Sequence, residues 1–140
     1  MLDNINPSLW GPHYWKVMHY ITIAYPDNPT PQDKEDIKNF FMAMGKVLPC
    51  ENCRIHYAMN IQKYPLTNDI LSSKYKIINW AKDIHNEVNI RTGKKPLSYE
   101  DVIEGCKKQN KINKIEIITI VLLIILMIII CVYIKYKFDI

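Results

Sequence analysis

Over the first 110 residues, apolar positions recur every three or four residues, which is the spacing of amphipathic helices. The clearest stripe lies within 74–92 and consists of Ile77, Ile78, Ala81, Ile84, His85 and Val88. A second stripe, within 31–47, consists of Ile37, Phe40, Phe41, Met44 and Val47. An alternating strand pattern of useful length does not occur. The pattern therefore predicts an all-α domain.

Proline, glycine and capping residues set the bounds of the predicted helices. These helices are His13–Ala24 after Gly11-Pro12, Pro31–Val47 with Thr30 as N-cap, a short third from the cysteine pair to about Ile61, Lys74–Thr92 with Gly93 at its C-cap, and a fifth that begins at the Ser98-x-x-Asp101 capping box. The prediction is a four-helix bundle plus a short fifth helix. A bundle of this size has a modest core, so a large bound cofactor at its centre would add buried surface.

The pattern changes completely after the bundle. Residues 117–134 read IITIVLLIILMIIICVYI, and with the flanking residues they reach the length of a helix that crosses a bilayer. We predict a domain over 1–110, a basic juxtamembrane linker over 111–116, a transmembrane anchor over 117–136 and a short tail over 137–140. The first ten residues lack an apolar, basic leader, which favours a tail-anchored protein inserted after synthesis. Tyr133 and Tyr136, with Lys135 and Lys137, are expected at one interface.

The net charge of +4 comes in part from lysines just before the anchor. These are Lys107, Lys108, Lys111 and Lys114. Anionic lipid headgroups explain such a cluster more simply than nucleic acid does, and no groove-reading motif accompanies it. By the positive-inside rule the domain is expected to face the cytosol.

Cys50 and Cys53, separated by two residues, are the one local cysteine pair. Such a pair chelates a metal or closes a disulfide ring, and the spacing alone does not choose between these functions. A zinc site would add His56 and, from far along the chain, His85. A redox site needs an electron acceptor that no side chain provides, and a flavin is the natural one because it passes two electrons from a thiolate to oxygen.

Other conspicuous residues favour the flavin. Trp15-x-x-x-His19 places an aromatic ring and an imidazole on one helix face, and Trp80 with His85-Asn86-x-Val88-Asn89 lies on another helix, before Gly93-Lys94. Aromatic, imidazole and amide groups followed by a basic turn would suit an isoalloxazine–adenine ligand with a diphosphate. The absence of Gly-x-Gly-x-x-Gly excludes a Rossmann flavin site.

At this point a family resemblance becomes specific. Gly11-x-x-x-Trp15-x-x-x-His19, Tyr25-Pro26, Cys50-x-x-Cys53-x-x-His56 and Trp80-x-x-x-x-His85-Asn86-x-Val88-Asn89-x-x-x-Gly93-Lys94 resemble, in order and spacing, the successive motifs of the Erv/ALR flavin-linked sulfhydryl oxidases. The resemblance covers roughly residues 9–106. The brevity, single redox pair and anchor look most like the versions of large cytoplasmic DNA viruses.

The resemblance implies roles for these residues. Cys53 would face the flavin of bound FAD, and Cys50 would exchange with the incoming thiol. The implied FAD-binding positions are Gly11, Trp15, His19, His56, Trp80, His85, Asn86, Val88, Asn89 and Lys94, with Tyr99 near the adenine. The chain departs from the family at Pro12, where an arginine is common, and at Cys106, which lacks a bridge partner around Leu97.

The resemblance also implies the reaction and the partners. Substrate dithiol and O2 would give a disulfide and H2O2, and the thiol would come from a protein or a thioredoxin-like carrier. A homodimer on a host cytoplasmic or virion membrane, within a viral disulfide-forming pathway, is the expected setting. The alternatives are a zinc-stabilised, membrane-tethered adaptor without catalysis, and a structural tail-anchored protein whose Cys-x-x-Cys is incidental.

Overall fold

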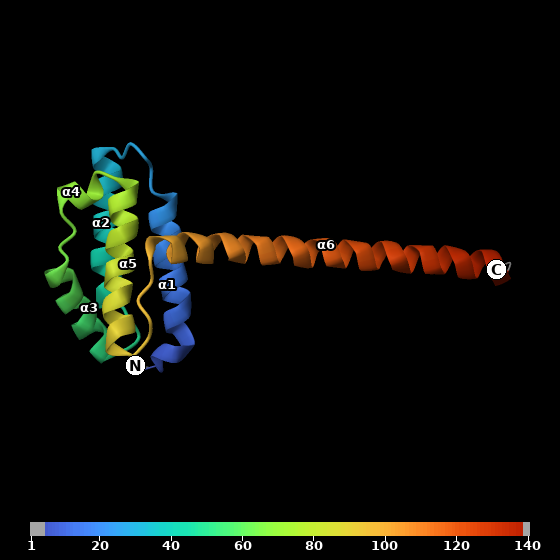
Figure 1. Cartoon of the computed structure of the whole chain (residues 1–140), viewed down its shortest axis with the longest axis horizontal. Helices are drawn as coiled ribbons and strands as arrows, with labels where there is room; N and C mark the ends of the chain where they lie inside the picture. Colours follow the sequence, from blue (N-terminus) through green and yellow to red (C-terminus); the bar gives the residue numbers. More distant parts are fainter. Residues whose placement is uncertain (1–4, 139–140) are drawn as a thin grey trace. The chain divides into compact units, whose positions relative to one another are not determined.

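The computed structural model describes the backbone of residues 5–138 and the side chains of 5–107 and 116–137. In this described part every regular element is a helix, and no strand occurs. The elements are α1 (Pro7–Ala24), α2 (Pro31–Lys46), α3 (Glu51–Lys63), α4 (Asn68–Leu71), α5 (Lys74–Arg91) and α6 (Tyr99–Phe138) (Figure 1). The predicted all-α class is confirmed.

Local chemistry explains where most helices begin. Thr30 and Asp33 form a complete capping box at α2, and Ser98 and Asp101 form the same reciprocal pair at α6. Both starts agree with the prediction. Helix α1 begins at Pro7 rather than His13, because Asn6 caps it and accepts a hydrogen bond from the Ser8 amide at 3.0 Å. The predicted start at Gly11-Pro12 was wrong, and Pro12 lies inside the helix.

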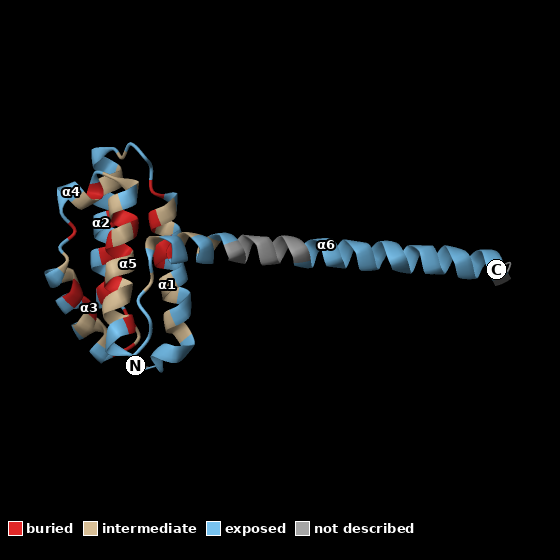
Figure 2. Ribbon diagram, viewed as in Figure 1, coloured by how far each residue is buried: buried red, intermediate tan, exposed pale blue. Residues whose placement is uncertain are grey.

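The chain divides into two compact units, Met1–Ile103 and Glu104–Ile140. In the first unit α5 packs against α1, α3 and α4, and α2 packs against α3 and α4. Figure 2 shows the buried residues of this unit, in red, on α1, α3 and α5 among others. The core is built mostly of large apolar side chains, with Phe41, Ile77 and Ile84 fully buried. Four long helices, α1, α2, α3 and α5, therefore form the predicted bundle, and α4 is one further turn that the sequence pattern missed.

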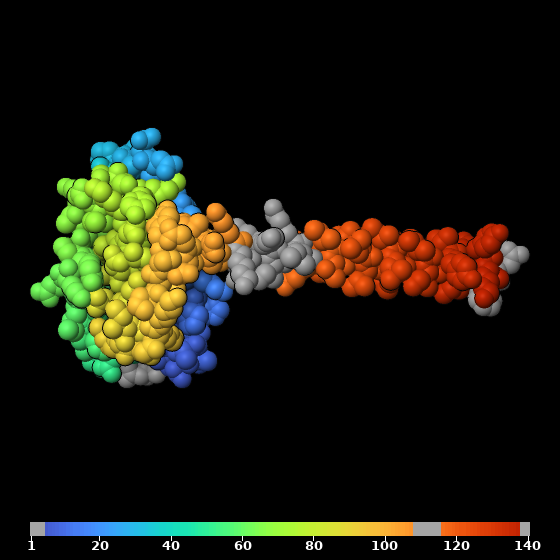
Figure 3. Space-filling view, in the orientation of Figure 1, coloured from blue at the N-terminus to red at the C-terminus, as the bar shows by residue number. Residues whose placement is uncertain are grey.

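In the second unit, Glu116–Lys137 is a 22-residue stretch of mean hydropathy 3.5. It is long and apolar enough to cross a membrane by length and composition alone. Figure 3 shows one face of it as a rod of side chains, coloured orange to red. The predicted linker at 111–116 falls mostly on residues whose side chains lie outside the described part, so the division of the chain at 110 stays a prediction.

Candidate active site

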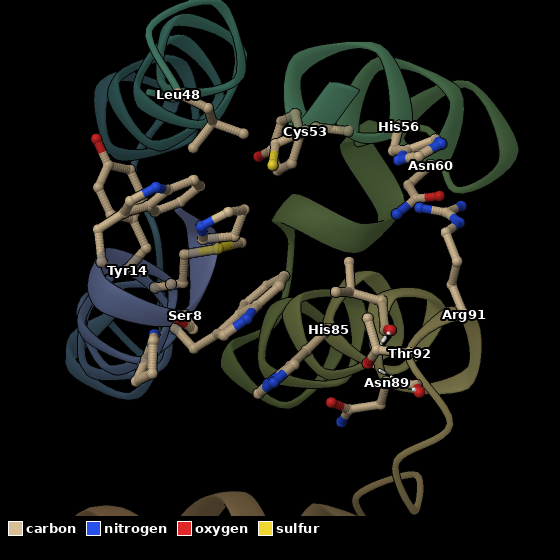
Figure 4. Close-up of a pocket in the computed structure, with 18 of the residues that line it drawn as sticks. Ser8, Tyr14, Leu48, Cys53, His56, Asn60, His85, Asn89, Arg91 and Thr92 are labelled. Carbon is tan, nitrogen blue, oxygen red and sulfur yellow. Dashed lines mark hydrogen bonds between the residues drawn. The ribbon is translucent and has the colours of Figure 1, made fainter. Parts of the chain in front are cut away.

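A cavity of about 520 Å³ opens between the helices of the first unit. Its volume lies within the usual range of small-molecule and cofactor sites. Figure 4 shows side chains from several helices pointing into it. The lining residues are Pro7, Ser8, Trp10, Gly11, Pro12, Tyr14, Trp15, Met18, Met44, Leu48, Cys53, His56, Tyr57, Asn60, His85, Val88, Asn89, Arg91, Thr92 and Lys94. Most of these side chains are aromatic or aliphatic. The polar ones come mainly from α3 and from the end of α5.

The cysteine pair lies at the edge of this cavity. Cys50 is the N-cap of α3, and its Sγ accepts a hydrogen bond from the Cys53 amide at 3.2 Å. The two cysteines form a disulfide. Cys53 is half-buried and lines the cavity, whereas Cys50 is 8 % exposed and does not line it. Because a helix N-terminus favours negative charge, this position stabilises a thiolate when the disulfide opens.

The segment before Cys50 is held in place by its neighbours. The Arg54 guanidinium donates to the Leu48 carbonyl at 2.6 Å, and the Ile5 amide donates to the Pro49 carbonyl at 2.9 Å. The Trp10 indole in turn donates to the Ile5 carbonyl at 3.0 Å. These bonds fix the chain that enters α3 and therefore the position of the disulfide beside the cavity.

Two histidines and a tryptophan form a group between α1 and α5, in which His19 is buried and Trp15 and His85 are half-buried. The Trp15 and His85 rings are stacked, 4.0 Å between centroids and 6° between planes. His19 Nε2 lies 2.9 Å from His85 Nδ1, so one of these nitrogens donates and the other accepts. Burial lowers the pKa of His19 to about 4, and burial with the charges of His19 and Lys94 lowers the pKa of His85 to about 3. Both imidazoles are therefore neutral at pH 7.

The end of α5 carries the polar side of the cavity. Gly93 adopts a left-handed φ of 70°, and the Lys94 amide donates to the Asn89 carbonyl at 2.8 Å. With the Gly93 amide donating to the Ile90 carbonyl at 3.2 Å, this is a Schellman cap. The turn brings Lys94 to the cavity beside Asn89, which is 6 % exposed. The predicted role of Gly93 as a cap is confirmed.

The structure brings together most of the residues that the sequence singled out. Gly11, Trp15, Cys53, His56, His85, Val88, Asn89 and Lys94 all line the cavity. His19 stands behind His85 as its hydrogen-bond partner. The ligand-binding roles of all these residues stay predictions at this point.

Three predicted residues lie elsewhere. The Trp80 indole packs edge-on against Phe41 and donates to the Tyr64 carbonyl at 2.8 Å. The Asn86 carboxamide makes two hydrogen bonds to the backbone of Leu97, at 2.9 and 2.7 Å. Tyr99 lies against Tyr75, with ring centroids 5.1 Å apart. None of the three is among the lining residues, so their contacts in this structure are with the protein itself.

Sequence reasoning missed several lining residues. On α1 they include Trp10, Tyr14 and Met18, which recur every four residues beside Gly11 and Trp15 and so share their helix face. On α3 they include Tyr57 and Asn60, four and seven residues after Cys53. Helical spacing from the motif residues was the signal that would have found them.

The arrangement suits a planar aromatic ligand with a negatively charged part. Aromatic rings from α1 and α3 line the cavity, Lys94 and Arg91 supply positive charge at the end of α5, and a disulfide sulfur, that of Cys53, reaches it. The described side chains include no group of three or more His, Cys, Asp or Glu placed to hold one metal ion. The zinc-adaptor alternative therefore lacks a ligand set within them.

Comparison with known proteins identifies the family. The model of the Erv1 / Alr family matches residues 12–114. A probable FAD-linked sulfhydryl oxidase of Acanthamoeba polyphaga mimivirus is 45% identical over 104 residues, which cover 74% of this chain and 73% of that protein. A putative FAD-linked sulfhydryl oxidase of Invertebrate iridescent virus 6 is 38% identical over 105 residues, which cover 72% of this chain and 94% of that protein.

A solved structure shares the fold. The FAD binding domain of Erv1 from Saccharomyces cerevisiae superposes with a TM-score of 0.68 at 22% identity, covering 75% of this chain and 97% of that chain. The shared fold and the sequence matches point to the same family. The chain belongs to the Erv1 / Alr family.

Proposed function

We propose that this chain is a FAD-linked thiol oxidase, which forms disulfide bonds in substrate proteins with O2 as acceptor and H2O2 as product. The observation that carries the proposal is the position of Cys53. This cysteine is joined to Cys50 at the start of α3 and also lines the cavity between the helices. A disulfide is thereby placed next to a site of cofactor size. Membership of the Erv1 / Alr family supports the same activity.

The residues present fit FAD. Trp10, Tyr14, Trp15 and Tyr57 give the cavity flat apolar walls for a ring system. The side chain of Asn60 is buried there, and its amide donor has no hydrogen-bond partner among the described residues. Such a donor is expected where a polar ligand atom binds. We propose that Gly11, Trp15, His56, His85, Val88, Asn89 and Lys94 contact FAD and that His19 acts through His85.

Trp80, Asn86 and Tyr99, which the sequence predicted as FAD-binding residues, do not line the cavity. Trp80 and Asn86 are proposed to support the site by holding helix α5 and the segment up to Leu97 in place. Tyr99 stays proposed as a neighbour of the adenine, although its observed contact is with Tyr75.

Thiol–disulfide exchange at the cysteine pair accounts for the oxidation of substrate. A substrate thiolate attacks Cys50 Sγ, the bond between Cys50 and Cys53 breaks, and Cys53 leaves as a thiolate. The second substrate thiol then attacks the mixed disulfide, forms the substrate disulfide and releases Cys50. The Cys53 amide donates to Cys50 Sγ, so the helix N-terminus stabilises the Cys50 thiolate that the second step releases. The pair now holds two electrons and the substrate has lost them.

FAD, when bound beside Cys53, would supply the two-electron chemistry that returns the cysteine pair to its disulfide and reduces O2 to H2O2. The chain's own residues hold the site for this transfer. Burial keeps His19 and His85 uncharged at pH 7, so they add no positive charge beside the stacked Trp15 ring. Their mutual hydrogen bond fixes the orientation of both imidazoles.

Access to Cys50 requires a local movement. Only 8 % of this residue is exposed, whereas the attacking thiolate must reach its sulfur in line with the disulfide. We propose that the short segment before Cys50, held by Arg54 and Ile5, opens when a substrate binds. The substrate is a protein thiol or a thioredoxin-like carrier.

The setting of the enzyme completes the proposal. Glu116–Lys137 would act as a single-pass tail anchor in a host cytoplasmic or virion membrane, with the domain on the cytosolic side. The side chains of Lys108, Lys111 and Lys114, on which this orientation depends, lie outside the described part. The viral relatives support a role in a viral cytoplasmic disulfide-forming pathway. We further propose that the enzyme is a homodimer, as the resemblance to the Erv/ALR family implies.

The proposal is tested on the full chain purified in a mild detergent. We expect a flavin absorption spectrum, O2 consumption with a small dithiol, and one H2O2 formed per O2 consumed. Cys53→Ser should abolish O2 consumption while keeping FAD bound, and Cys131→Ser, within the apolar stretch, should leave the rate unchanged. A colourless protein that contains stoichiometric zinc would refute the proposed function.

A further inference from the structure

Asn60 is a buried polar residue that none of the recognised motifs includes. It lies near the end of α3, lines the cavity and is 3 % exposed. Its carboxamide Nδ2 has no hydrogen-bond partner among the described residues. Figure 4 shows the side chain at one edge of the cavity, together with His56 and Arg91.

The side chain is not needed to end the helix. The backbone carbonyl of Asn60 accepts the Tyr64 amide at 2.8 Å, and that bond closes the last turn of α3. Tyr57, three residues earlier on the same helix, donates its hydroxyl to the Phe41 carbonyl at 3.1 Å. Since buried amide donors are nearly always hydrogen-bonded in folded proteins, the donor of Asn60 indicates an acceptor that arrives with a ligand.

Position on the helix links this donor to the redox pair. Cys53, His56, Tyr57 and Asn60 stand at positions i, i+3, i+4 and i+7 of α3, so they share one face. Seven residues of α-helix rise about 10 Å. A ligand lying along this face therefore meets the sulfur of Cys53 near one end and the carboxamide of Asn60 near the other.

We infer that Asn60 Nδ2 donates a hydrogen bond to an acceptor atom of FAD and contributes to its affinity. The inference rests on the proposed function, because it takes FAD as the ligand of the cavity. It makes Asn60 a cofactor-binding residue of this chain. In the apoprotein the same donor lowers stability, because it is buried without a partner.

The test measures two quantities on the apoprotein of the full chain in detergent. One is the Kd for FAD, from the change of flavin fluorescence on binding, and the other is the urea midpoint, from tryptophan fluorescence. For Asn60→Leu we expect a Kd about tenfold higher, equivalent to about 1.4 kcal/mol, and a urea midpoint that is unchanged or higher. Asn39→Leu, at an exposed position of α2, is the control and should leave the Kd unchanged.

Asn60→Asp keeps the size of the side chain and replaces the donor with a carboxylate. It should weaken FAD binding at least as much as Asn60→Leu, because an acceptor would then face an acceptor. If Asn60→Leu lowered the urea midpoint as well as the affinity for FAD, the result for Asn60→Asp decides. Weaker FAD binding by Asn60→Asp supports the inference, and wild-type affinity in that variant overturns it.

The same titrations separate this inference from the proposed function. Wild-type apoprotein that binds no FAD would overturn both. Wild-type affinity for FAD in Asn60→Leu would overturn the inference alone and leave the oxidase intact. Repeating the titration with riboflavin locates the acceptor: a tenfold loss of riboflavin affinity places it on the isoalloxazine ring or the ribityl chain, and a loss confined to FAD places it in the diphosphate or adenosine part.

Discussion

Replacing Gly45 with alanine tests how closely α2 and α3 approach each other beside the cavity. A Cβ built at Gly45 would overlap the ring of Tyr57, at its Cδ1 and Cε1 atoms. Tyr57 is 7 % exposed, and its hydroxyl donates to the Phe41 carbonyl. The ring therefore has no room to turn aside without giving up this buried hydrogen bond.

The expected cost follows from these contacts. Overpacking a well-filled core costs about 1–3 kcal/mol, and breaking the Tyr57 hydrogen bond adds about 1 kcal/mol. Alanine is a better helix former than glycine by about 1 kcal/mol, which acts in the opposite direction. The net prediction for Gly45→Ala is a destabilisation of about 1–3 kcal/mol. Displacement of the ring into the cavity should also weaken FAD binding.

The assay is urea unfolding of the apoprotein, followed by tryptophan fluorescence. Trp10, Trp15 and Trp80 all lie in the first unit, so the signal reports on the bundle and not on the apolar stretch. In a Tyr57→Leu background, Gly45→Ala should leave the unfolding free energy nearly unchanged or raise it, because the tyrosine ring that the new methyl group would meet is absent. If Gly45→Ala raised the urea midpoint in the wild-type background, the close approach of the two helices would be refuted.

Three further predictions concern the histidines, a buried amide and a helix cap. The pKa values of His19 and His85, about 4 and about 3, lie below their value of about 6.5 in the unfolded chain, so the unfolded chain binds more protons between these limits. Stability of the apoprotein should fall on acidification from pH 7 to about pH 5, with a slope of up to about 1.4 kcal/mol per pH unit for each histidine. His19→Gln should make this dependence shallower, and an unchanged slope would contradict the assignment. Asn86→Ala should lower the unfolding free energy by about 1–3 kcal/mol, because it leaves both backbone groups of Leu97 without their partner, and a change near zero in the urea midpoint would refute that role. Thr30→Ala should lower the unfolding free energy by about 1 kcal/mol in the same assay, because it removes the α2 cap. An unchanged urea midpoint would show that this cap does not stabilise the helix.

Sequence patterns located the helices where local chemistry sets their ends. Thr30 and Ser98 have side chains that cap the backbone directly, so the starts of α2 and α6 could be predicted from residue types alone. The start of α1 could not be, because Gly11-Pro12 imitates a helix start inside a helix that Asn6 already caps. Helix α4 is four residues long, too short for any apolar period to be seen.

The candidate site was predicted in part for similar reasons. Motif residues such as Trp15 and His85 stand on the helix faces that close over the cavity, so their spacing indicated their position. Asn86 is adjacent to His85 in sequence but points to Leu97, since neighbouring residues on a helix face different directions. Asn60 belongs to no motif, and only its burial without a partner reveals it. That property depends on tertiary packing, which a single sequence does not display.

In the proposed reaction, electrons pass from a substrate thiol through the Cys50–Cys53 pair to FAD. The decisive experiment adds a small dithiol to the purified full chain under anaerobic conditions while the visible flavin band is recorded. We expect the wild type to lose this band and Cys53→Ser to keep both its FAD and its band. Loss of the band in Cys53→Ser at the wild-type rate, or a wild-type flavin that stays oxidised, would contradict it.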